Sequence, residues 1–228
     1  MPEKHQALQA KSIEAMMDSK LIKAVVFDVF GTLAFIADKR RPYERMMRLL
    51  RTAGRAAEAS DAARLMSNNL GLADTLHLFG AQLPAPALAA LELDLRAELS
   101  SIQLYPDAQG TLSSLRQSGY KIGICSNLAA PYAVPIKRLL LPFDVDATAW
   151  SFDVGAVKPD SSIYKKICEE LACSPHEILM VGDSLEADYT GPRAFGMHAI
   201  QLVRSGMSSE EESVKSIAEI IEILTTER

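Results

Sequence analysis

Residues 22–33 read IKAVVFDVFGTL, an apolar run that stops at an acid and then passes through a glycine. A short aliphatic run without strict alternation is typical of a strand buried on both faces of a parallel sheet. Asp28 stands at the carboxyl end of this expected strand, where open α/β sheets place their ligands. Gly31 allows a sharp turn, and the Thr32 hydroxyl can form a hydrogen bond within it. Taken alone, Asp28 could equally cap a turn or a helix.

Further apolar runs of the same kind occupy residues 120–125, 148–152, 178–181 and 199–203. Helical patterns lie among them at residues 107–118, 160–171 and 213–224, and the second of these follows Pro159. Alternating strands and helices predict an α/β fold, a doubly wound parallel sheet with helices on both faces. We expect five strands in this sheet.

The stretch from about residue 36 to residue 104 breaks the alternation. It contains only helical patterns, at residues 42–52, 61–70 and 86–102. An all-helical block that follows the first strand of an α/β sheet indicates an inserted subdomain. We therefore assign residues 1–20 to an N-terminal extension, residues 21–35 and 105–228 to the α/β core, and residues 36–104 to a helical cap.

The composition narrows the class of protein. The chain has 228 residues, of which 48% are hydrophobic and 23% are charged, as in ordinary globular domains. A net charge of −5 argues against a nucleic-acid-binding protein, and the lack of an 18-residue apolar run argues against a membrane helix. Three cysteines without a C-x-x-C pair, and an N-terminus without the apolar stretch of a secretory signal, lead us to expect a cytoplasmic protein. Nothing in the sequence indicates the oligomeric state.

Polar side chains follow other expected strands as well. Ser126 and Asn127 come directly after residues 120–125, and Asp183 follows residues 178–181, with Asp188 five positions later. Lys158 lies in a loop between these segments, just before a proline. Each residue has an ordinary structural explanation, such as a helix start or a solvated helix position. Because the carboxyl ends of parallel strands meet at one edge, we expect the whole set to share one crevice.

These four segments, in this order and spacing, resemble the four motifs of the haloacid dehalogenase-like superfamily of hydrolases. The resemblance runs from about residue 22 to residue 204, and the helical block sits where that family carries a helical cap of the C1 type. It implies a Rossmann-like core and a reaction in which an aspartate forms a covalent intermediate that water later hydrolyses.

The resemblance also implies roles for individual residues. The expected catalytic residues are Asp28 as nucleophile, Ser126 and Lys158. Substrate binding is expected at Gly31, Thr32, Ser126, Asn127 and Lys158. A Mg²⁺ ion would be held by Asp28, the backbone carbonyl of Phe30, Asp183 and Asp188.

Phe30 departs from the pattern of the family's phosphatases. They usually carry a second aspartate at this position, which protonates the leaving group, whereas the 2-haloacid dehalogenases of the family commonly carry an aromatic residue there. Asp183 favours a phosphatase instead, because those dehalogenases use no metal and carry a different residue in place of this acid. Asp28, Asp183 and Asp188 beside one lysine leave a charge of −2, which calls for a divalent cation.

We therefore favour a Mg²⁺-dependent phosphatase that acts on a small phosphorylated metabolite through an aspartyl-phosphate. One alternative is a metal-free 2-haloacid dehalogenase with the same nucleophile. Another is a catalytically weak scaffold with a binding role. The expected partner is a small anionic substrate, with no nucleic acid and no membrane.

The expected cap also contains a basic stretch. Between residues 39 and 55 lie Lys39 and six arginines in an otherwise acidic chain. This stretch could attract an anionic substrate over the crevice, or it could be a solvated helix face. His77 could supply the proton that Phe30 cannot, or it could be an ordinary surface residue.

Overall fold

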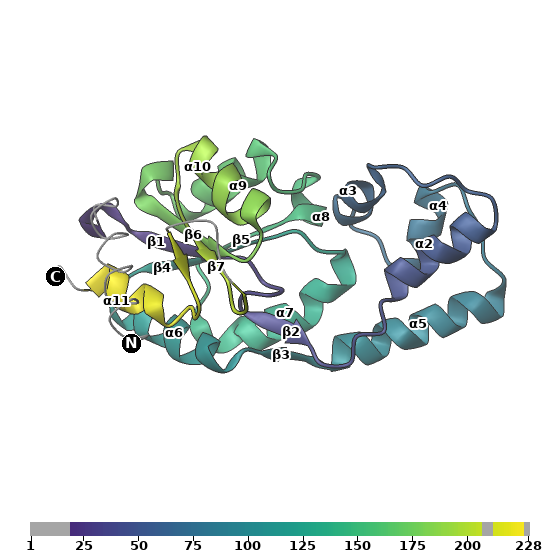
Figure 1. Ribbon diagram of the computed structural model, residues 1–228, viewed down its shortest axis with the longest axis horizontal. Helices are drawn as coiled ribbons and strands as arrows, with labels where there is room; N and C mark the ends of the chain where they lie inside the picture. The colour runs from purple at the N-terminus through teal and green to yellow at the C-terminus, as the bar shows by residue number, and fades with distance from the viewer. Residues whose placement is uncertain (1–18, 207–211, 226–228) are drawn as a thin grey trace.

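The computed structural model describes residues 19–206 and 212–225, and within them six strands form one parallel sheet (Figure 1). The strand order is β5-β4-β1-β6-β7-β8, so β1 lies in the interior of the sheet between β4 and β6. This arrangement confirms the predicted α/β fold. The strands are β1 Ala24–Phe27, β4 Lys121–Ser126, β5 Ala147–Trp150, β6 Ile178–Gly182, β7 His198–Leu202 and β8 Ser213–Val214.

Helices cover both faces of this sheet. Val25 and Phe27 of β1 pack into one apolar core, whereas Ala24 and Val26 pack into another, because successive side chains of a strand point to opposite faces. Burial on both faces explains why the strand sequence shows no alternation. The first face is covered by α6 Pro106–Gln117, α7 Ala133–Leu140 and α11 Glu219–Thr225, and the second by α9 Ser161–Leu171 and α10 Gly191–Phe195 (Figure 1).

The inserted region lies beyond one end of the sheet (Figure 1). It contains the helices α2 Pro42–Thr52, α3 Asp61–Met66, α4 Leu72–Leu78 and α5 Ala85–Ser100. A two-stranded antiparallel ribbon, β2 Ala34–Ile36 with β3 Ile102–Leu104, joins it to the α/β core. The insert is therefore mainly helical, and its two connections to the core run side by side.

The insert corrects several sequence predictions. The expected helix 86–102 ends at Ser100, and Ile102 belongs to the ribbon, because its backbone pairs with Ile36. The expected helix 61–70 ends at Met66, and α4 was not predicted. Residues 1–18, most of the expected N-terminal extension, lie outside the described residues.

The C-terminal half differs in two places. The expected helix 213–224 was wrong at its start, since Ser213 and Val214 pair with β7 as a sixth strand and the helix begins only at Glu219. The expected strand 148–152 ends at Trp150, where α8 Ser151–Val154 begins. A π-helical segment, η5 Leu185–Thr190, precedes α10. Short 3₁₀ segments complete the described chain: η1 Ser19–Leu21, η2 Ala130–Tyr132, η3 Leu141–Phe143 and η4 Pro175–Glu177.

The insert also touches the core at a second place, away from the ribbon. The fully buried Ser151 hydroxyl at the start of α8 donates to the carbonyl of Met66 at 2.7 Å and accepts from the backbone N–H of Leu128 at 3.1 Å. Asn69 donates to the Asp153 carboxylate at 3.2 Å. These contacts hold the end of α3 over the carboxyl edge of the sheet.

Two further properties concern the cysteines and the length and polarity of the helices. All three cysteines are free and buried, and burial raises the pKa of the Cys125 thiol to about 12. Among the described residues, every helix is too short or too polar to cross a bilayer.

Candidate active site

The turn after β1 places Asp28 at the carboxyl edge of the sheet. The Asp28 backbone N–H donates to the carbonyl of Val181 at 3.0 Å, which continues the pairing of β1 with β6. The chain then folds back, with the N–H groups of Thr32, Leu33 and Ala34 all directed at the carbonyl of Val29. Gly31 adopts φ +90°, a left-handed conformation that is unfavourable for residues other than glycine. The Asp28 side chain is thus fixed at the sheet edge and is only 11% exposed.

Ser126 and Lys158 converge on one oxygen of Asp28. The Ser126 hydroxyl donates to Asp28 Oδ1 at 2.9 Å, and the Lys158 ammonium donates to the same atom at 2.8 Å. Lys158 also donates to the carbonyl of Cys125 at 2.7 Å and to Asp188 Oδ1 at 2.5 Å. Its three N–H groups are therefore all used by buried acceptors, which fixes the orientation of the Asp28 carboxylate.

Asn127 and Thr32 take structural positions next to these groups. The Asn127 amide donates to the carbonyl of Lys158 at 2.9 Å and accepts from its N–H at 2.7 Å, so it holds the lysine's loop against β4. The Thr32 side chain is fully buried, and its hydroxyl has no hydrogen-bond partner among the described residues. Both residues lie at the carboxyl edge of the sheet, as expected. Asn127 bonds to the protein backbone and the Thr32 hydroxyl is buried.

Three carboxylates gather at this edge. One oxygen from each of Asp28, Asp183 and Asp188 lies within 4.8 Å of the others. Two glycines make the approach possible: a Cβ on Gly31 would lie 2.3 Å from an Asp183 oxygen, and a Cβ on Gly182 would lie 2.4 Å from the Asp188 carboxylate. Such a set of hard oxygen donors, with Asp183 exposed and Asp28 and Asp188 buried, fits a Mg²⁺-sized cation.

The electrostatics of the cluster agree with that fit. Burial raises the pKa of Asp28 to about 7, against the opposing effect of the Lys158 ammonium, and the neighbouring Asp188 raises it further. Burial and the charge of Asp188 also raise the pKa of Asp183. Burial alone would lower the pKa of Lys158, but Asp28 and Asp188 outweigh it and raise that pKa. The lysine therefore stays charged, and the carboxylates still carry more negative charge than it offsets.

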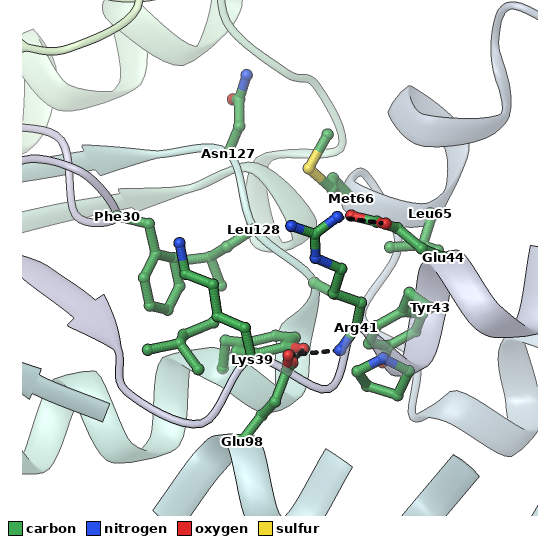
Figure 2. Close-up of a pocket in the computed structure, with 14 residues that line it drawn as sticks. Phe30, Lys39, Arg41, Tyr43, Glu44, Leu65, Met66, Glu98, Asn127 and Leu128 are labelled. Atoms are coloured by element: carbon green, nitrogen blue, oxygen red, sulfur yellow. Dashed lines mark hydrogen bonds and ion pairs between the residues drawn. The ribbon is translucent and has the colours of Figure 1, made fainter. Parts of the chain in front are cut away.

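A cavity of about 430 Å³ adjoins this cluster, between the sheet edge and the insert (Figure 2). Phe30 and Asn127, which lie close to Asp28 and Ser126 in the chain, form part of its wall. The Phe30 ring packs edge-to-face against Tyr132, with ring centroids 5.7 Å apart. The remaining lining residues are Ile36, Lys39, Arg41, Pro42, Tyr43, Glu44, Leu65, Met66, Glu98, Leu128, Ala129 and Tyr132.

The basic stretch contributes only in part to this cavity. Four of its six arginines pair with acids of the insert: Arg40 and Arg45 with Asp94, Arg41 with Glu44, and Arg55 with Asp61. Arg45, Arg48 and Arg51 lie exposed on α2, which supports the interpretation of that part as a solvated helix face. Lys39 and Arg41 differ from the other basic residues because they line the cavity. His77 is exposed on α4 and is not among the cavity-lining residues.

Arg204 is a residue that the sequence analysis missed. Its guanidinium donates to the carbonyls of Gly31 at 3.1 Å and Thr32 at 2.6 Å, and it forms an ion pair with Asp107 at 3.0 Å. It also lies over the Tyr105 ring, 3.8 Å from the centroid. Arg204 thereby supports the turn that follows Asp28 from the far end of the chain. A single arginine after the last strand of the predicted sheet carries no local signal of this role.

Comparison with known proteins agrees with this geometry. The sequence profile of the haloacid dehalogenase-like hydrolases matches residues 22–196. Ribulose-1,5-bisphosphate 5-phosphatase of Halopiger xanaduensis is 34% identical over 140 residues, which cover 61% of this chain and 59% of that protein. (S)-2-haloacid dehalogenase 4A of Burkholderia cepacia is 29% identical, covering 92% of this chain and 96% of that protein. Among solved structures, a HAD phosphatase from Thermococcus onnurineus superimposes with a TM-score of 0.63 at 28% identity, over 90% of this chain and 98% of that one.

Proposed function

Because this chain belongs to the haloacid dehalogenase-like hydrolase family, we propose that it is a Mg²⁺-dependent phosphatase of a small phosphorylated metabolite, with Asp28 as the nucleophile. The observation that carries the proposal is the meeting of three carboxylates with a single buried ammonium group. With all three carboxylates ionised, two negative charges remain in excess there, and a dianionic phosphate adds to them. A divalent cation is the simplest way to balance that charge.

Each side chain of the site has a different role in phosphoryl transfer. Asp28 attacks phosphorus and forms an aspartyl-phosphate as the P–O bond of the ester breaks and its oxygen leaves with the organic group; water then hydrolyses the aspartyl-phosphate, which releases inorganic phosphate and restores Asp28. Ser126 and Lys158 hold Asp28 Oδ1, and they are placed to neutralise charge that develops on the phosphoryl oxygens. Asp188 anchors Lys158 through its Oδ1, while its Oδ2 accepts from the backbone N–H of Ser184 at 3.0 Å. Asp28, Asp183 and the backbone carbonyl of Phe30 would hold Mg²⁺, which would supply charge neutralisation when bound.

Phe30 limits the substrates that such an enzyme handles well. Its ring can neither protonate a leaving oxygen nor activate water, and general acid–base help is worth roughly 10²–10⁴ in rate. Good leaving groups need no proton in the transition state. We therefore infer that aryl or acyl phosphates are hydrolysed faster than alkyl phosphates.

A 2-haloacid dehalogenase is the second candidate. It is favoured by the aromatic side chain of Phe30 and by the 29% identity with a haloacid dehalogenase along 92% of this chain. The same Asp28 would then attack carbon and release halide, a leaving group that needs no acid. The presence of Asp183 favours the phosphatase, because the metal-free reaction has no use for a third carboxylate in the crevice.

One set of assays separates these candidates. We expect turnover of p-nitrophenyl phosphate and acetyl phosphate with Mg²⁺, its loss with EDTA, and its loss in Asp28→Asn. Metal-independent halide release from 2-chloropropionate would reverse the order of the two candidates. No turnover of any phosphate or haloacid would instead favour a binding role for the scaffold.

The variant Phe30→Asp tests the missing-acid argument directly. It should raise kcat for an alkyl phosphate by roughly 10²-fold, because it restores a group that can protonate the leaving oxygen. Phe30→Leu is the matched control, since it also removes the aromatic ring but supplies no proton. An alkyl phosphatase rate that is no higher in Phe30→Asp than in Phe30→Leu would contradict the argument.

A further inference from the structure

The cavity beside Asp28 has mainly apolar and aromatic walls. Phe30, Tyr43 and Tyr132 contribute rings to it, and aliphatic or small side chains from both the core and the insert complete most of the remaining surface. Its volume of about 430 Å³ lies within the range of small-molecule sites, roughly 300–1,000 Å³. The walls therefore suit an organic group of the size of a substituted aromatic ring.

Most polar groups that line the cavity are already engaged within the protein; the exception is the Tyr43 hydroxyl, which is buried without a hydrogen-bond partner among the described residues. Asn127 is bonded on both sides of its amide to the Lys158 backbone. Glu98, only 2% exposed, accepts from the Tyr132 hydroxyl at 2.5 Å and from the Arg41 backbone N–H at 2.6 Å (Figure 2). A polyhydroxylated substrate would find the Tyr43 hydroxyl as a free neutral partner here and would bury its remaining hydroxyl groups without partners, at a cost of several kcal/mol in general.

Two cations line the same cavity, and they differ in their pairing. The Arg41 guanidinium lies 3.4 Å from the Glu44 carboxylate, so its charge is partly used (Figure 2). Lys39, from the segment between β2 and α2, has no ion-pair partner among the described residues. An unpaired ammonium group at the edge of an apolar cavity is a binding position for an anion.

We propose that this cavity selects substrates whose organic part is an aromatic ring bearing a carboxylate, with the ring against Phe30 and Tyr132 and the carboxylate paired to Lys39. The proposal rests on the proposed function in one respect, namely that the group removed at Asp28 is a phosphoryl group. The missing proton donor at position 30 supports it independently, because a phenolic oxygen leaves without one.

Binding measurements test this selection without any turnover. Isothermal titration calorimetry on the Asp28→Asn protein compares 3-hydroxybenzoate with phenol, which lacks the carboxylate, and with glycerate, which keeps it on a polar body. We expect 3-hydroxybenzoate to bind at least tenfold more tightly than either. The inference is overturned if phenol or glycerate binds as tightly as 3-hydroxybenzoate.

The variant Lys39→Gln tests the anion partner. The ratio of kcat/KM for 3-carboxyphenyl phosphate to that for phenyl phosphate should fall about tenfold, and the affinity for 3-hydroxybenzoate should fall to a similar extent. Arg96→Gln, an exposed position on α5 outside the cavity lining, is the matched control and should change neither. A ratio that Lys39→Gln leaves intact would refute the assignment of Lys39.

The two proposals can fail separately. If 3-hydroxybenzoate binds as expected and Lys39→Gln weakens it, but no phosphate ester is hydrolysed, the proposed function fails and the selection of aromatic carboxylates stands. If aryl phosphates are hydrolysed regardless of a carboxylate, the proposed function stands and the selection fails.

Discussion

Replacing Asp28 by asparagine should stabilise the folded protein, and the gain should grow between about pH 4 and pH 7. Burial raises the pKa of Asp28 from about 4 in an unfolded chain to about 7 in the fold. The folded state therefore binds more protons than the unfolded state in this window, so the free energy of unfolding falls as the pH rises through it. Above pH 7 the full cost of ionising a buried carboxyl group remains.

The size of the effect follows from the pKa shift of Asp28. Each unit of pKa shift corresponds to 1.36 kcal/mol, so a shift of about three units costs the fold about 4 kcal/mol at pH 8. Asparagine removes this cost and can still accept from Ser126 and Lys158. The shift of about three units already includes the attraction between Asp28 and the Lys158 ammonium, which opposes burial, so the loss of that attraction is not subtracted a second time. We expect a net gain of up to about 4 kcal/mol at pH 8 and a smaller one at pH 5.

Urea unfolding of both proteins at pH 5 and pH 8, without divalent cations, measures this difference. Asp160→Asn is the matched control: Asp160 accepts from Ser162 as the N-cap of α9, its pKa is lowered, and its replacement should destabilise the protein at pH 8. Mg²⁺ should then stabilise the unaltered protein more than Asp28→Asn. The reasoning is refuted if Asp28→Asn is less stable than the unaltered protein at pH 8.

Three further variants test the support of the site. Gly31→Ala should weaken Mg²⁺ binding, measured by calorimetry, at least tenfold, because its Cβ would lie 2.3 Å from an Asp183 oxygen. The control is Gly54→Ala: Gly54 has φ +97° and open space around it, so this variant carries the same backbone strain and should not weaken Mg²⁺ binding. Arg204→Gln should lower the free energy of unfolding by about 1.5–3 kcal/mol and reduce kcat, since two carbonyls of the turn after β1 lose a charged donor. If stability and kcat are both unchanged, the turn does not depend on Arg204. Ser151→Ala should lower the free energy of unfolding by about 1–3 kcal/mol and speed proteolysis of the insert, because the Ser151 hydroxyl joins the insert to the core. An unchanged digestion rate would show that this contact does not restrain the insert.

Local sequence determined the main sheet and the identity of the clustered acids. The runs around Asp28, Ser126 and Asp183 are apolar without alternation, which is the direct consequence of burial on both faces of a parallel sheet. Once the strands are parallel, their carboxyl ends must meet at one edge. The convergence of these residues with Lys158 and Asp188 therefore follows from strand direction and order, and the structure places all five together.

The elements that were missed depend on contacts between distant segments. Ser213 and Val214 are too short a run to signal a strand, and they become one only because β7 offers an open edge. The ribbon at the base of the insert has the same origin, since Ile102 fits a helical stripe in the sequence but pairs with Ile36 in the fold.

The division between sequence and tertiary structure is clearest at the cavity beside Asp28. The sequence pattern singles out Asp28 as the proposed nucleophile, together with Lys158 and the acids around it, because these residues follow strand ends in a recognisable order. It does not show that Arg204 supports Gly31 across 173 positions of the chain, or that Glu98 accepts from Tyr132 across 34 positions. Such pairings have no local periodicity, because they arise only when the insert packs onto the sheet edge and brings side chains of unrelated segments within hydrogen-bonding distance.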